Sequence, residues 1–338
     1  MAAAPPLAEG AEQSGLVYGY VFSADGIGRE IDNQAAISWL AQGDEVGQEF
    51  IWMHFKRPAA TTHQWLQGHL ELPEAFTDVL EQGSRSTRVE HAHRSLIAVI
   101  NDVEYDLPRK ESLDVATLWL SAGPRYLLSV QSQPLRSVEQ LHVSVEAGES
   151  FISPLALVIH LLGEQADVLV HILRDAAATV NRIEDNLLAD QLPKRTNLGV
   201  IRRDLVRLQR LLAPEPAALF RLINRPPNWV RAEDIQGLHQ ATEGFSVVLR
   251  DMAGLQERIK LLQEEIAARV GEHTNRTVFV LTAATVVALP ITLIAALLGM
   301  NVGGVPFHQD AEGFWIVVAL ALVITGLAAW LIARLWKN

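Results

Sequence analysis

Two long uncharged stretches near the end of the chain constrain its fold more than any other feature. Residues 277–309 contain no Asp, Glu, Lys or Arg, and residues 313–333 form a second uncharged run. A helix of about 20 apolar residues crosses the ~30 Å hydrocarbon core of a bilayer. We therefore predict an integral membrane protein whose transmembrane domain, residues 277–338, contains spans at 277–298 and 314–335 joined by a loop at 299–313.

The charges that flank these spans predict their orientation. Arg269 and Arg276 precede the first span, Arg334 and Lys337 close the second, and the loop between them holds no Lys or Arg. Because basic residues are retained on the cytoplasmic side, both termini are predicted to be cytoplasmic. The first residues show no basic region followed by an apolar stretch, so no signal peptide is expected.

The part of the chain before the spans divides into regions of different pattern. Residues 1–14 are expected to be disordered, and residues 15–150 alternate short β-like runs with helical patterns, which indicates an α/β domain. Residues 151–276 are predicted to be helical, beginning at Ser153-Pro154, a favourable helix start. The expected strands are 16–22, 50–55, 95–99, 117–120 and 126–130, and the expected shorter helices are 63–70, 73–82, 197–212 and 216–223.

A repeat of apolar residues predicts one very long helix. Apolar side chains and Thr242 recur at steps of mostly three and four from Ile235 to Val270, with one irregularity near Met252. No proline separates this stripe from the first span, so we predict a single helix over residues 230–298. At about 1.5 Å per residue it would be on the order of 100 Å long. It must bury its stripe against copies of itself or against the preceding helices.

Composition excludes several classes of function. The net charge of −11 argues against nucleic-acid binding, which needs clustered Lys and Arg. The chain has no cysteine, so any zinc site must use His, Asp, Glu or water. Neither a G-x-x-x-x-G-K phosphate loop nor a nucleophile–base constellation is visible, so neither an enzyme nor a permanently bound cofactor is expected.

One face of the first span carries small and hydroxyl side chains. At about 100° per residue, its three threonines lie within ~20° of one another. Threonine in a membrane helix often bonds back to its own carbonyls, so helix packing and a pore lining are both open interpretations. The candidate pore-lining residues are Thr274, Leu281, Thr285, Ala288, Thr292 and Ala295.

The end of this span carries a recognisable signature. Residues Leu289 to Asn301 read L-P-I-T-L-I-A-A-L-L-G-M-N. The proline, the Thr-containing apolar turn and the terminal G-M-N, together with two C-terminal spans and a long upstream helix, resemble the CorA family of divalent-cation transporters across nearly the whole chain. The continuation V-G-G-V-P, residues 302–306, resembles the ZntB zinc-transporter branch. Leu298 stands where the magnesium branch usually has an aromatic residue, and the M-P-E loop of that branch is missing.

The resemblance implies an α+β membrane protein that forms a homopentamer in the bacterial inner membrane. The α/β domains would form a cytosolic funnel, and the long stalk helix would continue into the first span to line a central pore. Its partners would be other copies of the chain, membrane lipid and divalent cations. The expected cargo is Zn²⁺, with a CorA-type channel for Mg²⁺, or for Co²⁺ or Ni²⁺, as the alternative. A membrane-tethered scaffold or sensor without transport is a further alternative.

The signature also supplies a candidate selectivity filter, formed by Gly299, Met300 and Asn301. Amide and carbonyl oxygens can hold a hydrated cation through its water shell without a formal charge that would trap it. Asn301 could equally serve as a helix C-cap, since Asn tolerates the left-handed conformation, and both roles can coexist.

Further candidate metal ligands lie outside the spans. Glu272 and His273 precede the first span at its cytosolic mouth, where they could bind zinc or could form a solvated helix face. His91 and His93, beside Glu90, would share one face of a strand and could chelate a metal. The stalk carboxylates that could concentrate cations, or could simply be solvated, are Asp251, Glu257, Glu264 and Glu265.

Overall fold

The computed structural model describes residues 15–42, 49–56, 60–70, 72–92, 94–104, 115–191, 197–300 and 312–337. The predicted disordered N-terminus, His93 and Asn301 lie outside these ranges. The chain divides into two compact units, the first ending at Leu261 and the second beginning at Leu262. The predicted domain limits at residues 150 and 276 stay predictions.

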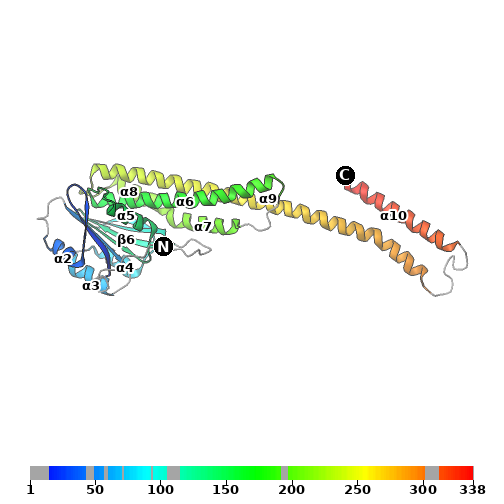
Figure 1. The fold of residues 1–338 in the computed structure, drawn as a ribbon, viewed down its shortest axis with the longest axis horizontal. Helices are drawn as coiled ribbons and strands as arrows, with labels where there is room; N and C mark the ends of the chain where they lie inside the picture. The colour runs from blue at the N-terminus through cyan, green and yellow to red at the C-terminus, as the bar shows by residue number, and fades with distance from the viewer. Residues whose placement is uncertain are drawn as a thin grey trace. The chain divides into compact units, whose positions relative to one another are not determined.

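The first unit is built around one mixed sheet in the order β2-β1-β3-β7-β6-β5-β4 (Figure 1). β3 and β7 pair in parallel, and the other neighbouring strands pair antiparallel. The five expected strands are confirmed, whereas the short strands β2 and β4 were not predicted. The strands are β1 Leu16–Phe22, β2 Gly28–Ile31, β3 Phe50–Lys56, β4 Arg88–Ala92, β5 Ser95–Val103, β6 Val115–Ala122 and β7 Tyr126–Gln131.

Helices cover both faces of this sheet, so its central strands are buried on both sides. Alternate residues of a strand point to opposite faces. Leu118 and Leu120 of β6 pack into the core under α5 and α6, whereas Trp119 packs into the core under α3 and α4 (Figure 1). The helices before the stalk are α2 Asn33–Ala41, α3 Ala60–His69, α4 Glu74–Gln82, α5 Arg136–Glu146, α6 Pro154–Leu188, α7 Leu198–Leu212 and α8 Pro214–Asn224.

The helix start predicted at Ser153 is confirmed by its capping geometry. The Ser153 hydroxyl accepts a hydrogen bond from the Ala156 amide at 2.9 Å, and Pro154 occupies the first helical position. The 35-residue helix α6 is long and apolar enough to cross a membrane, but 44% of its apolar window is buried inside the chain. It is a core helix of the first unit.

The predicted long helix is confirmed as α9, Ala232–Leu298, which crosses the boundary between the two units. Within the first unit its stripe is buried, with Leu238, Phe245, Met252 and Ile259 each at most 1% exposed. The Ser153 hydroxyl donates to Asp234 at 2.8 Å, and the Arg258 guanidinium bonds Glu184 of α6 at 2.7 Å. Preceding helices therefore cover this part of the stripe.

The second unit contains the C-terminal part of α9 and the helix α10, Gly313–Lys337. Both are long and apolar enough to cross a membrane, and none of either apolar window is buried inside the chain. Pro290 lies inside α9 without ending it, as membrane helices tolerate. The predicted spans 277–298 and 314–335 lie within these two helices, and their limits stay predictions.

Candidate functional site

The six candidate pore-lining residues lie on one helix, and no other part of the described chain covers them. All six predicted residues lie on the C-terminal part of α9 and are exposed in the single chain. The hydroxyl groups of Thr274 and Thr285 donate to carbonyl oxygens one turn earlier, at 2.8 and 2.9 Å. Thr292 donates to the carbonyls of Ala288 and Leu289 at 3.1 and 2.8 Å.

These backbone hydrogen bonds leave the chemistry of the stripe compatible with both interpretations. Each hydroxyl donates its hydrogen bond to a carbonyl of its own helix, so it does not need a hydrogen-bond partner on another helix. Its oxygen keeps a lone pair that can accept a hydrogen bond from a hydrated ion. A single chain supplies one such row of oxygens, and a pore would need further rows from other chains.

The predicted filter begins where α9 ends. The Gly299 amide donates to the Ala295 carbonyl at 3.0 Å, and a side chain at this position would place its Cβ 2.9 Å from the same oxygen. Glycine therefore allows a close approach that another residue would obstruct. Met300 is 49% exposed. Asn301 lies outside the described residues, so its filter and C-cap roles stay predictions.

The structure gathers no metal site around the other candidate ligands. Glu272 and His273 are exposed on α9, and His91 is exposed on β4. Within the described ranges, no three His, Asp or Glu side chains converge where they could hold a metal ion. A ring of His273 would need copies of the chain, and the pairing of His91 with His93 lies outside the described residues.

Two of the stalk carboxylates are already paired on their own helix. Glu257 contacts Lys260 at 3.3 Å, and Glu265 contacts Arg269 at 2.8 Å. Asp251 and Glu264 are exposed. Exposed pairs of this kind contribute on the order of 0–1 kcal/mol, which fits a solvated helix face.

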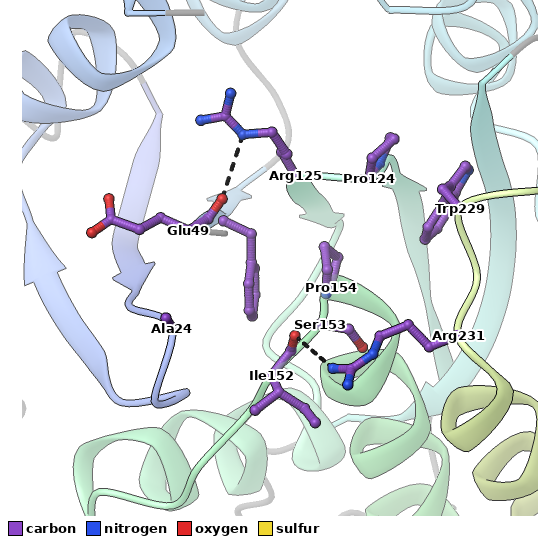
Figure 2. A pocket seen from close by; sticks show the side chains of 10 residues that line it. Ala24, Glu49, Pro124, Arg125, Ile152, Ser153, Pro154, Trp229 and Arg231 are labelled. Carbon is purple, nitrogen blue, oxygen red and sulfur yellow. Dashed lines mark hydrogen bonds between the residues drawn. The ribbon is translucent and has the colours of Figure 1, made fainter. Parts of the chain in front are cut away.

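A pocket of about 400 Å³ lies in the first unit, and none of the residues predicted for cation transport lines it (Figure 2). The Arg125 Nε donates to the Glu49 carbonyl at 3.4 Å. Arg231 donates to the Ile152 carbonyl at 3.3 Å and pairs with Glu233 at 2.8 Å. The wall holds two guanidinium groups and a single carboxylate, that of Glu49, whereas a divalent cation needs several oxygen ligands.

An aromatic cluster on the sheet was missed by sequence reasoning. The Tyr18 ring stacks on His54 with centroids 4.8 Å apart and on His142 with centroids 4.1 Å apart. Two rings that both stack on a third at these distances must occupy its opposite faces, so the two histidines cannot chelate one ion. Burial, together with a smaller effect of the neighbouring His142, lowers the pKa of His54 from 6.5 to about 3. His54 is therefore a neutral core residue.

The ends of α10 carry groups suited to a membrane interface. Trp315 is 69% exposed near one end, and the Arg334 guanidinium lies over the Trp330 ring at 5.5 Å near the other. Tryptophan and arginine are common anchors at the headgroup level. This arrangement supports a membrane-spanning role for α10.

Comparison with known proteins gives a consistent family. The family of CorA-like Mg²⁺ transporter proteins matches residues 47–334. The chain is 28% identical to the divalent cation transporter CmaX of Pseudomonas aeruginosa over 97% of this chain and 98% of that protein. It is 22% identical to the zinc transport protein ZntB of Yersinia pestis over 84% of this chain and 86% of that protein.

Solved structures agree over nearly the full length. Full-length CmaX matches with a TM-score of 0.81 and 27% identity, covering 96% of this chain and 98% of that one. The CorA magnesium transporter from Methanocaldococcus jannaschii matches with a TM-score of 0.75 and 18% identity, covering 94% and 98%. The predicted resemblance to the CorA family, with ZntB among its relatives, is confirmed. This chain belongs to the family of CorA-like Mg²⁺ transporter proteins, which carry divalent cations across membranes.

Proposed function

We propose that this protein transports Zn²⁺ across the bacterial inner membrane through a central pore formed by five copies of the chain. One observation carries the proposal. The stripe on α9 from Thr274 to Ala295 presents hydroxyl and small side chains along a membrane-spanning helix, and the single chain leaves it exposed. The hydroxyl oxygens along this row keep lone pairs that can accept hydrogen bonds from the water shell of a hydrated ion.

The family resemblance supports a homopentamer, and so does the uncovered apolar face of α9. An apolar helix whose face is not covered by its own chain must meet lipid, another protein or copies of itself. Five copies of α9 around an axis would enclose the stripe, with α10 packed outside against lipid. Both termini would lie in the cytoplasm, since the basic residues flank the spans on that side.

In this pore the proposed filter would act on the hydrated ion. Asn301 amides and Gly299 carbonyls from five chains would form rings of neutral oxygens at the end of α9. Such oxygens accept hydrogen bonds from the polarised waters around a cation and select by size and dipole. The flux would be driven by the ion gradient, by the membrane potential or by a coupled proton.

Zinc is favoured over magnesium by the G-G-V-P sequence after the signature and by the ZntB relatives. A magnesium channel is the second candidate, because the likeness to the CorA magnesium transporter extends over 94% of this chain. The ring of His273 at the cytosolic mouth would suit zinc, which prefers nitrogen ligands.

Flux into proteoliposomes that hold the purified protein tests this proposal. Zinc and magnesium reporters should be compared with and without a pH gradient, with Asn301→Ala as the matched variant. We expect zinc flux well above magnesium flux, a large loss in Asn301→Ala, and a pentamer by light scattering in mild detergent. Magnesium flux without a preference for zinc would instead support the second candidate function, a magnesium channel. Flux unchanged in Asn301→Ala would refute the filter, and a monomer would refute the pore.

A further inference from the structure

A group of polar side chains lies buried at the free end of β5, far along the chain from the spans. β4 pairs with β5 only as far as Arg88 opposite Val99, whereas β5 runs on to Val103. Beyond that pair, no strand among the described residues lies beside this edge of β5. Buried backbone groups on such an edge must find other partners.

Two helices supply these partners. The Asn101 amide donates to Glu215 Oε1 of α8 at 3.2 Å, and the Asn101 carbonyl accepts from Gln165 Nε2 of α6 at 2.7 Å. Gln165 Nε2 also lies 3.2 Å from Glu215 Oε2. The three groups close a ring of hydrogen bonds in which two side chains replace a strand.

The next residue of β5 brings a second carboxyl group into the same region. Asp102 Oδ2 accepts from the amide and the hydroxyl of Ser137 on α5, at 3.1 and 2.5 Å. Asp102, Gln165 and Glu215 are each at most 2% exposed. Two carboxyl groups are thus enclosed by β5, α5, α6 and α8.

The hydrogen bonding of this cluster lacks a donor. Among the described residues, the buried atoms without a hydrogen-bond partner include Asp102 Oδ1 and Gln165 Oε1, and both are acceptors. A carboxylate can only accept, whereas a protonated carboxyl group also donates. One added proton would therefore supply the missing donor and remove one of two buried charges. A metal cation would fit poorly, because the Asn101 N–H and the Gln165 NH₂ already point at Glu215.

We propose that Glu215 and Asp102 form a buried proton-binding site that holds one proton at neutral pH and fastens α6 and α8 to the edge of β5. This site is independent of which cation the protein transports. Residues 225–231 alone separate α8 from α9. The proton-dependent contact therefore lies on the helix that immediately precedes α9 in the sequence.

The electrostatics of the cluster agree with its geometry. Burial raises the pKa of Glu215 well above its ordinary value and the charge of Asp102 raises it further, while the hydrogen bonds from Asn101 and Gln165 oppose the shift. Burial likewise raises the pKa of Asp102, against the hydrogen bonds from Ser137 and the Val103 backbone and the charge of Arg136. Arg136 is exposed on α5.

The sign of the pH dependence follows from these directions. A carboxyl group whose pKa is raised by folding binds protons more tightly in the folded state. Its contribution to stability is present below the ordinary carboxyl pKa and is lost as the pH rises through the folded-state value. Alkaline conditions should therefore weaken the attachment of α6 and α8 to β5, because loss of the proton leaves two buried negative charges in the cluster.

Infrared difference spectroscopy of the full-length protein in detergent tests this site directly. Above about pH 6 ordinary Asp and Glu are ionised, so a protonated-carboxyl C=O band there reports a raised pKa. We expect this band in the wild type, its loss at alkaline pH, and its absence in Glu215→Gln, whose amide mimics the protonated carboxyl. The exposed Glu257→Gln is the control and should leave the band unchanged.

Asp102→Asn keeps the proposal testable if Glu215→Gln fails to fold. Removing the neighbouring charge should lower the pKa of Glu215, so the band should disappear at a lower pH than in the wild type. No band above about pH 6 in the wild type, or a band that neither variant alters, would overturn the proposal. A band lost only in Glu215→Gln, with no shift in Asp102→Asn, would overturn the sharing between the two carboxyls.

Discussion

The two units of this chain handle apolar side chains in opposite ways. In the first unit the large side chains lie inside, and Trp52 and Trp119 are each 1% exposed. In the second unit the apolar windows of α9 and α10 have no residue buried in the chain. The first unit completes its core from one chain, whereas the second needs lipid or other copies to cover its surface.

A single helix contains both situations. Leu255 of α9 is 5% exposed against its own chain, whereas Leu281 of the same helix is 69% exposed. The same residue type on the same helix therefore depends on different surroundings. We therefore expect lipid or other copies of the chain to cover the apolar side chains of the second unit, and the following experiments test this expectation.

The largest expected effect comes from truncating the buried part of the stripe. Leu255→Ala should destabilise the first unit by about 2–5 kcal/mol, because it leaves a cavity in a packed core. Leu261→Ala, six residues later and 55% exposed, is the matched control and should cost less than about 0.5 kcal/mol. Urea unfolding followed by tryptophan fluorescence measures both. An equal loss in Leu261→Ala would show that another copy buries Leu261.

Acid unfolding should reveal the buried His54 of the first unit. Its pKa is lowered on folding from 6.5 to about 3, so the unfolded state binds protons more tightly and stability falls as the pH drops below about 6.5. At pH 5 the loss should be about 2 kcal/mol, from 1.5 pH units at about 1.36 kcal/mol each.

His54→Phe keeps a ring against Tyr18 but cannot be protonated. Its stability should vary less between about pH 6.5 and pH 4 than that of the wild type, as measured by urea midpoints at each pH. An acid dependence identical to the wild type would show that His54 is not buried in the neutral form.

A charge added to the stripe of the second unit should alter transport. Thr292→Asp would place a ring of carboxylates around the proposed axis, so cations should bind more tightly and leave more slowly, with maximal flux reduced by about three- to tenfold. Thr292→Ser keeps the bond to the helix and should transport normally. Unchanged flux and selectivity in Thr292→Asp would place Thr292 against a neighbouring helix.

The smallest effect is expected at the cytosolic mouth. His273→Ala should weaken the apparent zinc affinity by about twofold and leave magnesium flux unchanged, since imidazole favours zinc. Flux titrations with each ion in proteoliposomes measure this. Equal changes for both ions would assign His273 to a solvated helix face.

Much of the architecture was predictable because it follows from local patterns. The five longer strands, the Ser153 cap and the continuous helix into the first span all depend on periodicity and helix signals within a few residues. The strands β2 and β4 escaped because they are short and carry little alternation. Their pairing with β1 and β5 stabilises them, and tertiary contacts of this kind leave little trace in the local sequence.

The candidate site was predictable in part, for a similar reason. The first uncharged segment and the threonine spacing lie on α9, and the G-M-N sequence follows directly after its end at Leu298, so contiguous sequence patterns identify all three. The Tyr18–His54–His142 stack and the Glu215–Asp102 cluster join residues more than 100 positions apart, and no local pattern announces them.

The sequence by itself therefore determined the positions of the two apolar segments long enough to cross a membrane, the length of α9 and the family to which the chain belongs. Only the tertiary structure decided that helix α6 is a core helix, that the stripe is buried as far as Leu262, and that two carboxyl groups meet at the end of β5. The physical reason is the separation along the sequence of the residues that interact. Periodicity and hydropathy act between neighbouring residues, whereas burial, hydrogen-bond partners and raised pKa values depend on groups that only folding brings together.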